Sequence, residues 1–216
     1  MSLALYRVLT TAARPLIRAY LEHRLRVGKE EAGRLGERLG EASLARPPGA
    51  LVWLHAASVG EAMSMLALID RINEGWKQIT LLVTTGTVTS ARIMAKRLPA
   101  GVLHQYVPVD RTAWVRRFLD HWKPGLVLWV ESEFWPNMLA ELRVRAVPVI
   151  LVNARISPAS FAGWRRWEGL IRRLLASFDF CLAQAESDRD KLLALGACDV
   201  RLAGNLKFAA APLPAD

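Results

Sequence analysis

The sequence predicts an α/β fold, a Rossmann-like domain with a doubly wound parallel sheet. Short apolar runs alternate along the chain with longer segments of helical periodicity. The runs are rich in Val, Ile and Leu and do not alternate with polar residues, which is typical of strands covered on both faces. Strands separated by helices imply right-handed crossovers and therefore parallel pairing. The length of 216 residues fits one such domain with an N-terminal extension.

The elements follow this alternation in order. The predicted strands are the apolar runs at Leu51–Ala57, Ile79–Thr85, Val102–Val107, Leu126–Glu131, Val147–Asn153, Phe178–Ala183 and Val200–Ala203. Helical periodicity is clearest between them at Glu61–Glu74, Thr112–Trp122, Trp135–Val144, Ser160–Ala176 and Glu186–Leu195. Ligands of such sheets bind beyond the carboxyl ends of the strands, so the residues that follow each strand are the candidate site.

Composition limits the function classes. With 52% hydrophobic residues, the chain has enough apolar side chains for a core. Lys and Arg number 29 against 20 Asp and Glu, and the net charge of +9 predicts an anionic partner. The aromatic residues lie in apolar or helical contexts and not in nucleic-acid recognition motifs, so no nucleic-acid partner is predicted. Cys181 and Cys198 form no CxxC pair, so we expect reduced thiols and neither a disulfide framework nor a zinc site.

The N-terminal segment, Leu3–Leu25, is predicted to be a helix interrupted by Pro15. Three arginines lie opposite its apolar face, which is formed by Leu5, Leu9, Ala12, Leu16 and Tyr20. The arginines are Arg7, Arg14 and Arg18. One interpretation is a helix in the membrane interface with its arginines toward anionic headgroups. The other is an amphipathic helix packed on the domain. No apolar run approaches the ~20 residues that a spanning helix needs.

The domain boundaries follow from breaks in the pattern. Pro47, Pro48 and Gly49 separate the N-terminal segment from the first strand. We therefore expect a helical segment at 1–48, membrane-associating under the first interpretation above, and a Rossmann-like domain at 49–208. Residues 209–216 read as the start of an interdomain linker.

The first strand leads into the string His55–Glu61. Ser58 and Glu61 have the spacing of a capping box, which is one interpretation of Glu61. In the other, the same geometry keeps an ionised carboxylate at the strand end, where it can accept a proton from a substrate hydroxyl. Ser58 and Gly60 are the candidate substrate-binding residues of this turn. The turn lacks the GxGxxG fingerprint of dinucleotide-binding folds.

Later strand ends add further candidates. Thr87 and Thr89 lie in a hydroxyl-rich turn that suits either a phosphate or a plain helix cap. Glu131 and Glu133 both lie at the end of an apolar strand. Burying such carboxylates costs free energy unless they are paired with another group or have a functional role. Arg155 follows the fifth strand, where it can bind an anion or pair with one of these glutamates.

Two basic features complete the candidate set. Lys207 follows the last strand and either reaches the same crevice or lies in a solvated loop. A cluster of aromatic and basic residues in the helix at 160–176 suits a membrane interface, or is the outer face of an ordinary helix. Its members are Trp164, Arg165, Arg166 and Trp167.

The strand-end motifs resemble those of one family, the Kdo transferases (3-deoxy-D-manno-octulosonic acid transferases). The matching strings, in order, are RLGERLG at Arg34–Gly40, HAASVGE at His55–Glu61, ESEFWPN at Glu131–Asn137, VNARIS at Val152–Ser157 and GNLKF at Gly204–Phe208. They recur along nearly the whole chain, and the combination is far more specific than any single string.

The resemblance implies the acceptor-binding half of a GT-B glycosyltransferase. Such an enzyme transfers Kdo from CMP-Kdo to the lipid A precursor at the cytoplasmic face of the inner membrane, with neither metal nor other cofactor. It implies that Glu61 is the general base and that Glu131 and Lys207 assist the transition state. Because the chain stops soon after Phe208, we expect the donor-binding half to be absent and this chain alone to be inactive.

Two alternatives remain open from sequence. One is a non-catalytic, membrane-peripheral α/β binding module, in which the acidic strand ends serve only as caps and ion pairs. The other is a different GT-B sugar-nucleotide transferase. Substitution of Glu61 separates the first alternative from a catalytic role.

Overall fold

A computed structural model describes residues 2–131 and 133–206 of the chain. A single parallel sheet of seven strands lies at its centre, in the order β3-β2-β1-β4-β5-β6-β7. The strands are β1 Leu51–Ala56, β2 Thr80–Thr85, β3 Leu103–Tyr106, β4 Leu126–Val130, β5 Val149–Ala154, β6 Phe180–Ala183 and β7 Val200–Leu202. The predicted doubly wound parallel sheet is confirmed, with each strand within two residues of its predicted bounds.

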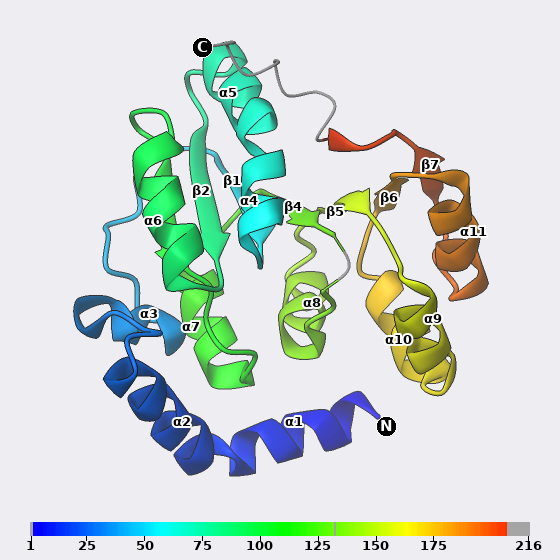
Figure 1. Cartoon of the computed structure of the whole chain (residues 1–216), viewed down its shortest axis with the longest axis horizontal. Coiled ribbons are helices and arrows are strands. Elements are labelled where there is room, and N and C mark those ends of the chain that lie inside the picture. Colours follow the sequence, from blue (N-terminus) through cyan, green and yellow to red (C-terminus); the bar gives the residue numbers. More distant parts are fainter. Residues whose placement is uncertain (1, 132, 207–216) are drawn as a thin grey trace.

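Helices cover both faces of the sheet (Figure 1). They are α1 Leu3–Ala12, α2 Arg14–Arg26, η1 Ala32–Arg34, α3 Leu35–Arg38, α4 Val59–Ser64, α5 Leu66–Gly75, α6 Val88–Arg97, α7 Thr112–Trp122, α8 Pro136–Val144, α9 Pro158–Arg165, α10 Glu168–Leu175 and α11 Glu186–Ala194. Apolar residues of α4, α5 and α6 pack in one core layer. Those of α7, α8, α10 and α11 pack in the other.

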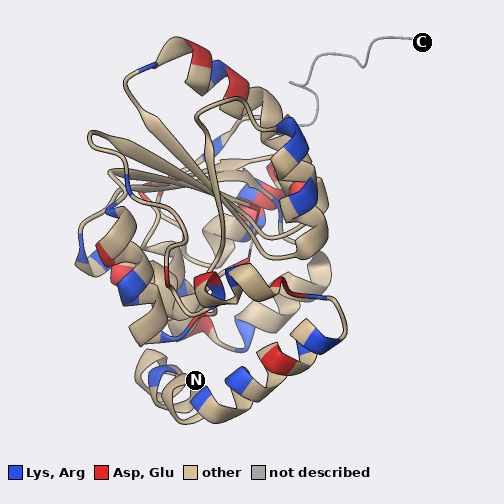
Figure 2. Cartoon of the chain, turned by 90° about the vertical axis from the view of Figure 1, so that its left-hand side faces the viewer, with Lys and Arg blue, Asp and Glu red and all other residues tan. Residues whose placement is uncertain are grey.

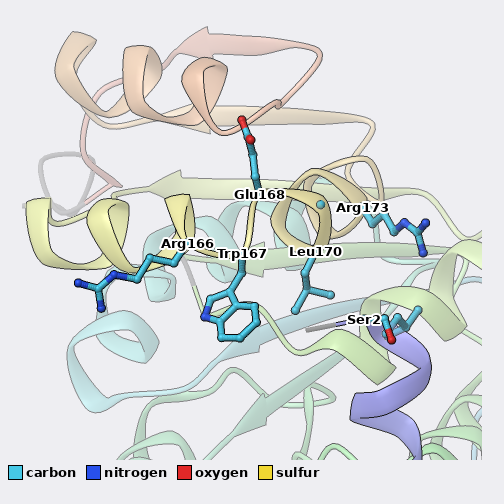
Figure 3. A pocket seen from close by; sticks show the side chains of 8 residues that line it. Ser2, Arg166, Trp167, Glu168, Leu170 and Arg173 are labelled. Atoms are coloured by element: carbon cyan, nitrogen blue, oxygen red, sulfur yellow. The ribbon is translucent and has the colours of Figure 1, made fainter.

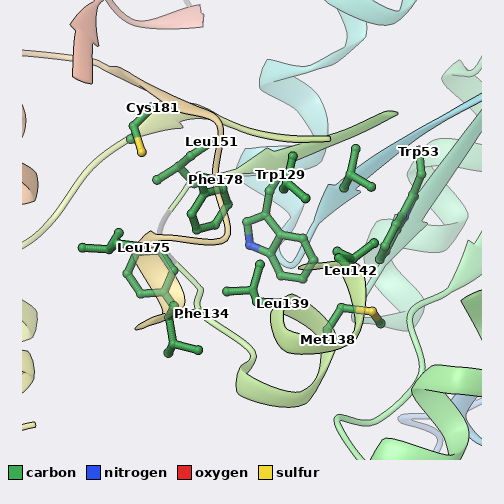
Figure 4. Close-up of a cluster of buried hydrophobic side chains, with 14 of the residues drawn as sticks. Trp53, Trp129, Phe134, Met138, Leu139, Leu142, Leu151, Leu175, Phe178 and Cys181 are labelled. Atoms are coloured by element: carbon green, nitrogen blue, oxygen red, sulfur yellow. The ribbon is translucent and has the colours of Figure 1, made fainter. Parts of the chain in front are cut away.

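Successive side chains of β1 pack alternately in these two layers. Trp53 points into the layer beneath α7 and α8, whereas Leu54 points into the layer beneath α4 and α5. Every residue of β1 is buried, which explains why its sequence shows no polar alternation. Figure 4 shows Trp53 and Trp129 in the first layer, beside Met138 and Leu139 of α8.

Two predicted helices are each divided in the structure. The first breaks at Met65 into α4 and α5, and the other breaks at Arg166 and Trp167 into α9 and α10. Periodicity did not predict either break, because a short change of direction between two amphipathic helices leaves the apolar spacing nearly intact.

The N-terminal segment forms two helices that meet at Ala13, with Pro15 in the first turn of α2. Proline is tolerated there because the first turn has no intrahelical donor to lose. Helix α1 packs against α7 and α8. Three of its apolar side chains point outward, with exposures of 49%, 65% and 52% for Leu5, Val8 and Leu9. None of the helices in the described ranges is long and apolar enough to cross a membrane.

The segment that follows is attached to the edge of the sheet. The buried carboxylate of Glu37 accepts two hydrogen bonds from Arg34, one from Ser43 and one from the main-chain N–H of Tyr106. The guanidinium of Arg38 donates to the carbonyl of Val107 at 2.8 Å. The string RLGERLG therefore has a clear structural role, which is to hold this segment against β3.

Candidate functional site

The sheet changes its winding direction between β1 and β4. The chain moves from β1 to β2 and β3 on one side, then crosses to β4 and continues to β7 on the other. Ligands of open α/β sheets bind at the carboxyl ends of the strands at such a switch point. Glu61 follows β1 and Glu131 follows β4. The fold therefore brings these two sequence candidates to the ends of adjacent strands.

The turn after β1 is built as a capping box. The hydroxyl of Ser58 accepts the N–H of Glu61 at 3.3 Å, and Oε2 of Glu61 accepts the N–H of Ala57 at 2.7 Å. Glu61 is 6% exposed, and its Oε1 accepts no hydrogen bond from the described residues. One carboxylate oxygen is thus fixed by the fold.

Gly60 borders this carboxylate and is exposed. A Cβ atom built at Gly60 would meet nothing within 4 Å, so packing does not require glycine there. The missing side chain leaves open space beside Glu61. By contrast, a Cβ at Gly86 would lie 3.0 Å from the carbonyl oxygen of Ala57, so Gly86 lets the turn after β2 approach the turn after β1.

The turn after β2 contains the two threonines predicted from sequence. Thr87 is the N-cap of α6, and its hydroxyl accepts the N–H of Ser90 at 3.1 Å. Thr89 is exposed in the first turn of the same helix. The geometry accounts for Thr87 as a helix cap, and a phosphate-binding role for either residue stays a prediction.

The end of β4 has an unusual backbone. Glu131 has a φ of +56°, a left-handed conformation that is uncommon for residues other than glycine, and its N–H is bonded to Val152. Further along this loop, the carbonyl of Glu133 accepts the indole N–H of Trp129 at 2.7 Å. Its Oε2 accepts the indole N–H of Trp135 at 3.3 Å. Two tryptophans thus fix Glu133.

Glu133 and Glu61 interact electrostatically. Partial desolvation raises the pKa of Glu133, the hydrogen bond from Trp135 lowers it, and the negative charge of Glu61 raises it again, so the net change is upward. Carboxylates that perturb one another in this way are common in functional sites. The switch point therefore holds a cluster of three acidic residues: Glu61, Glu131 and Glu133.

A buried polar network lies within β1 and β2, next to this cluster. Thr84 Oγ1 accepts the indole N–H of Trp53 at 2.8 Å and lies 2.9 Å from Nδ1 of the fully buried His55. Burial lowers the pKa of His55 to about 3, so the imidazole is neutral at physiological pH. The rings of Trp129 and Trp135 have centroids 4.4 and 5.4 Å from it. Nε2 of His55 has no hydrogen-bond partner in the described ranges.

The end of β5 lies beside the end of β4. Asn153, with a φ of +56°, accepts the N–H of Leu206 through Oδ1 at 3.1 Å. Arg155 is exposed, and it forms no hydrogen bond or ion pair with the described residues, so the predicted pairing with Glu131 or Glu133 is not seen. Lys207 lies outside the described residues.

Sequence reasoning missed several residues of this site. His55 was visible only as one polar residue in an apolar run, and its partner Thr84 is set by the register in which β1 pairs with β2. Asp110, which binds the start of α8, gave no signal, because its partners are 27 and 28 residues away. No group of three metal-binding side chains occurs in residues 2–131 and 133–206.

A cavity lies away from the switch point. A cavity of about 400 Å³ separates the start of α1 from the turn between α9 and α10. Figure 3 shows Arg166, Trp167 and Arg173 around it, together with Ser2 of the N-terminal segment. Trp167 is 48% exposed. The aromatic and basic cluster predicted from sequence is therefore next to α1 in space.

Comparison with known proteins identifies the family. Residues 33–210 match the family model described as 3-deoxy-D-manno-octulosonic-acid transferase (kdotransferase). The chain belongs to the Kdo transferase family. The matched range includes every strand of the sheet and all the candidate site residues.

Curated relatives support this membership. A probable 3-deoxy-D-manno-octulosonic acid transferase, mitochondrial, of Arabidopsis thaliana is 37% identical over 94% of this chain and 46% of its own length. The 3-deoxy-D-manno-octulosonic acid transferase of Rickettsia bellii is 36% identical over 97% of this chain and 50% of its own. That of Bordetella pertussis is 37% identical over 82% and 41%. The chain spans about half the length of the curated relatives that it matches.

Solved structures agree on the fold. A UDP-GlcNAc 2-epimerase from Neisseria meningitidis has a TM-score of 0.53 at 14% identity, covering 73% of this chain and 47% of that one. A UDP-N-acetylglucosamine 2-epimerase from Rickettsia bellii has a TM-score of 0.51 at 16% identity, covering 74% and 46%. These likenesses support a GT-B-type Rossmann-like domain and carry no information on substrate.

Proposed function

We propose that this chain is the acceptor-binding half of an inverting glycosyltransferase that moves Kdo from CMP-Kdo to a lipid A precursor, lipid IVA. Membership of the Kdo transferase family supports the reaction class. The observation that carries the proposal is the placement of Glu61 and Glu131 at the ends of β1 and β4, the two strands that flank the switch point.

In the proposed reaction, Glu61 is the general base. Its free oxygen, Oε1, accepts the proton of the primary hydroxyl of the acceptor as that oxygen attacks the anomeric carbon of Kdo. The bond from this carbon to the phosphate oxygen of CMP breaks, and CMP leaves with the electron pair. The bond from Ala57 N–H to Oε2 orients the carboxylate throughout this step.

The other candidates act on charge and orientation. Lys207 supplies positive charge near the developing negative charge of the leaving group. Glu131 either faces the positively polarised sugar or orients a basic residue. Ser58, Gly60, Thr87, Thr89, Glu133 and Arg155 are the proposed substrate-binding residues. The donor, CMP-Kdo, is held mainly by a second domain, which corresponds to the half of the curated relatives that this chain does not match.

The lipid acceptor also explains the N-terminal helices. We propose that α1 and α2 lie on an anionic membrane at the cytoplasmic face of the inner membrane. Leu5, Val8 and Leu9 expose an apolar surface on α1, and Leu16 and Tyr20 extend it along α2, with exposures of 73% and 59%. Basic residues recur along α2 (Figure 2), whereas α1 carries Arg7 alone. Arg7 does not face the headgroups as its helical position suggested, because it forms an ion pair with Glu141 of α8 at 3.2 Å.

One observation favours the non-catalytic alternative. The capping box alone gives Glu61 a structural role, because its carboxylate binds Ala57 and its N–H binds Ser58. The two proposals differ in an assay that supplies a donor-binding half and measures transfer from CMP-Kdo to lipid IVA. A catalytic Glu61 predicts loss of transfer in Glu61→Gln, whereas a capping role alone predicts transfer at the wild-type rate.

A further inference from the structure

The start of α8 is capped by a residue from a different loop. Trp135 occupies the N-cap position, but its side chain does not accept a capping hydrogen bond from the helix, and Pro136 has no N–H to donate. The next two N–H groups, of Asn137 and Met138, donate to the two carboxylate oxygens of Asp110 at 3.0 and 2.8 Å. Asp110, which lies between β3 and α7, therefore replaces the missing capping side chain of α8.

The same carboxylate is bound by the N-terminal helix. The hydroxyl of Tyr6 donates to Oδ2 of Asp110 at 3.0 Å, and Asp110 is 8% exposed. Two further contacts join α1 to α8. The amide of Asn137 donates to Thr10 Oγ1 at 3.3 Å, and Arg7 pairs with Glu141. The inward face of α1 thus contacts the helix that begins at the candidate site.

The position of α8 determines where the acidic loop ends. The acidic loop, defined here by the described residues 131 and 133–135, carries Glu131 and Glu133, and its last residue, Trp135, is the N-cap of α8. Trp135 also donates to the Glu133 carboxylate and packs beside His55. Anchoring the first turn of α8 therefore fixes one end of the segment that presents both carboxylates.

We infer that Asp110 is a positioning residue for the acidic loop. We also infer that its hydrogen bond to Tyr6 couples the position of this loop to the packing of α1 against α8. This inference rests on the function proposed above for the loop and for α1. The outward face of α1 carries Leu5, Val8 and Leu9, which a membrane would cover. A surface that binds α1 while α1 is packed against α8 favours the hydrogen bond between Tyr6 and Asp110. It thereby favours the observed positions of Glu133 and Trp135.

Amide hydrogen exchange of this chain tests the positioning role. Asp110→Asn loses one carboxylate acceptor, and we expect the amides of residues 133–135 and 137–139 to exchange about fivefold faster, as for a lost helix cap. Tyr6→Phe removes only the hydroxyl and should accelerate the same amides, while amides of β1 and β4 stay unchanged. The matched control is Asp120→Asn on α7, whose exposed carboxylate pairs with Arg145. Equal exchange of residues 133–135 and 137–139 in all four proteins would overturn the inference.

Anionic vesicles of phosphatidylglycerol and phosphatidylcholine test the coupling. Wild-type chain bound to vesicles should protect residues 133–135 and 137–139 further, and Tyr6→Phe should bind equally well without that protection. Equal protection in both proteins would contradict the coupling. If wild-type chain does not bind vesicles, the proposed membrane role of α1 fails, while exchange without vesicles still decides the role of Asp110.

An activity measurement separates positioning from general destabilisation. When a donor-binding half is supplied, Tyr6→Phe should lower kcat about fivefold and leave KM for CMP-Kdo unchanged, since the donor site is untouched. A purely structural role predicts a normal kcat for the folded fraction.

Discussion

Oε2 of Glu61 lies 2.7 Å from the main-chain nitrogen of Ala57, four residues earlier in the chain. The proposed catalytic carboxylate is therefore also part of the turn that presents it. A single side chain stabilises the start of α4 with one oxygen, and the proposed reaction uses the other oxygen. The two roles can be separated by choosing substitutions that preserve one of them.

Stability should distinguish two substitutions at this position. Glu61→Gln keeps a carbonyl oxygen for the Ala57 N–H, so its free energy of unfolding should stay within about 0.5 kcal/mol of wild type. Glu61→Ala removes the acceptor and should cost about 1 kcal/mol, as for a lost cap. Urea denaturation of the two variants measures the difference. Equal losses would show that the bond to Ala57 contributes nothing to stability.

The buried Glu37 should matter more than any surface ion pair. Its carboxylate is 1% exposed and accepts four hydrogen bonds, two of them from Arg34. Glu37→Ala removes the shorter of the two ion pairs of Arg34 and leaves the N–H of Tyr106 without its partner, and we expect a loss of about 3 kcal/mol. The control is Glu41→Ala, whose exposed pair with Arg117 should be worth less than about 1 kcal/mol. Similar losses for both variants, measured in urea, would contradict the structural role given to Glu37.

Acid should destabilise the fold through two buried histidines. Burial lowers the pKa of both His55 and His104 to about 3, from the ordinary histidine value of 6.5. Below about pH 6.5 the unfolded chain binds two protons that the folded chain does not, so the stability of the fold declines as pH falls. Asp110 acts in the opposite direction, because burial raises its pKa to about 6 and its folded form binds a proton first.

Over most of this range the slope is set by the two imidazoles against the carboxyl of Asp110, and the raised pKa of Glu133 reduces the slope at the acid end. Each group contributes about 1.4 kcal/mol per pH unit where only one state is protonated. Between about pH 6 and 4.5 the free energy of unfolding should therefore fall by about 1.4 kcal/mol per unit. His104→Gln should nearly abolish this slope, and chemical denaturation at several pH values measures it. A slope that His104→Gln leaves unchanged would show that this imidazole is not held neutral.

Vesicle binding should depend on the outward face of α1. Replacing Leu5, Val8 and Leu9 together by serine removes exposed apolar surface from α1. Each side chain that is partly buried in the membrane should contribute about 1 kcal/mol to the binding free energy, so the triple variant should bind anionic vesicles at least tenfold more weakly. The fold should be unaffected, because these side chains are half exposed or more. Trp76→Ser is the control, since this tryptophan is 52% exposed at the end of α5, far from α1 in Figure 1. Undiminished binding by the triple variant would assign α1 a structural role only.

Sequence alone predicted the sheet and the strand-end position of the candidate site. Strands that are covered on both faces have uninterrupted apolar runs, rich in Val, Leu and Ile. Seven such runs in the sequence therefore predicted the seven strands. Glu61 and Glu131 could be placed because parallel strands end at one edge of the sheet. Their adjacency needed the strand order, which puts β4 beside β1.

Contacts between distant segments could not be predicted in the same way. Arg7 and Glu141 are 134 residues apart, and Asp110 is separated from Tyr6 by 104 residues. Neither pair leaves a local signal, since each partner alone resembles an ordinary surface residue. For the same reason the helical periodicity of the N-terminal segment did not show that Arg7 turns toward α8.

The central claim is that Glu61 is the general base of a Kdo transfer reaction. The most direct test supplies a donor-binding half, by fusion or by mixing, and measures transfer from CMP-Kdo to lipid IVA by wild type, Glu61→Gln and the control Glu74→Gln on the exposed side of α5. The account predicts that Glu61→Gln loses a factor of about 10²–10⁴ in kcat while Glu74→Gln is unchanged. Turnover of Glu61→Gln within about twofold of wild type would contradict it, and Glu61 would then be a helix cap alone.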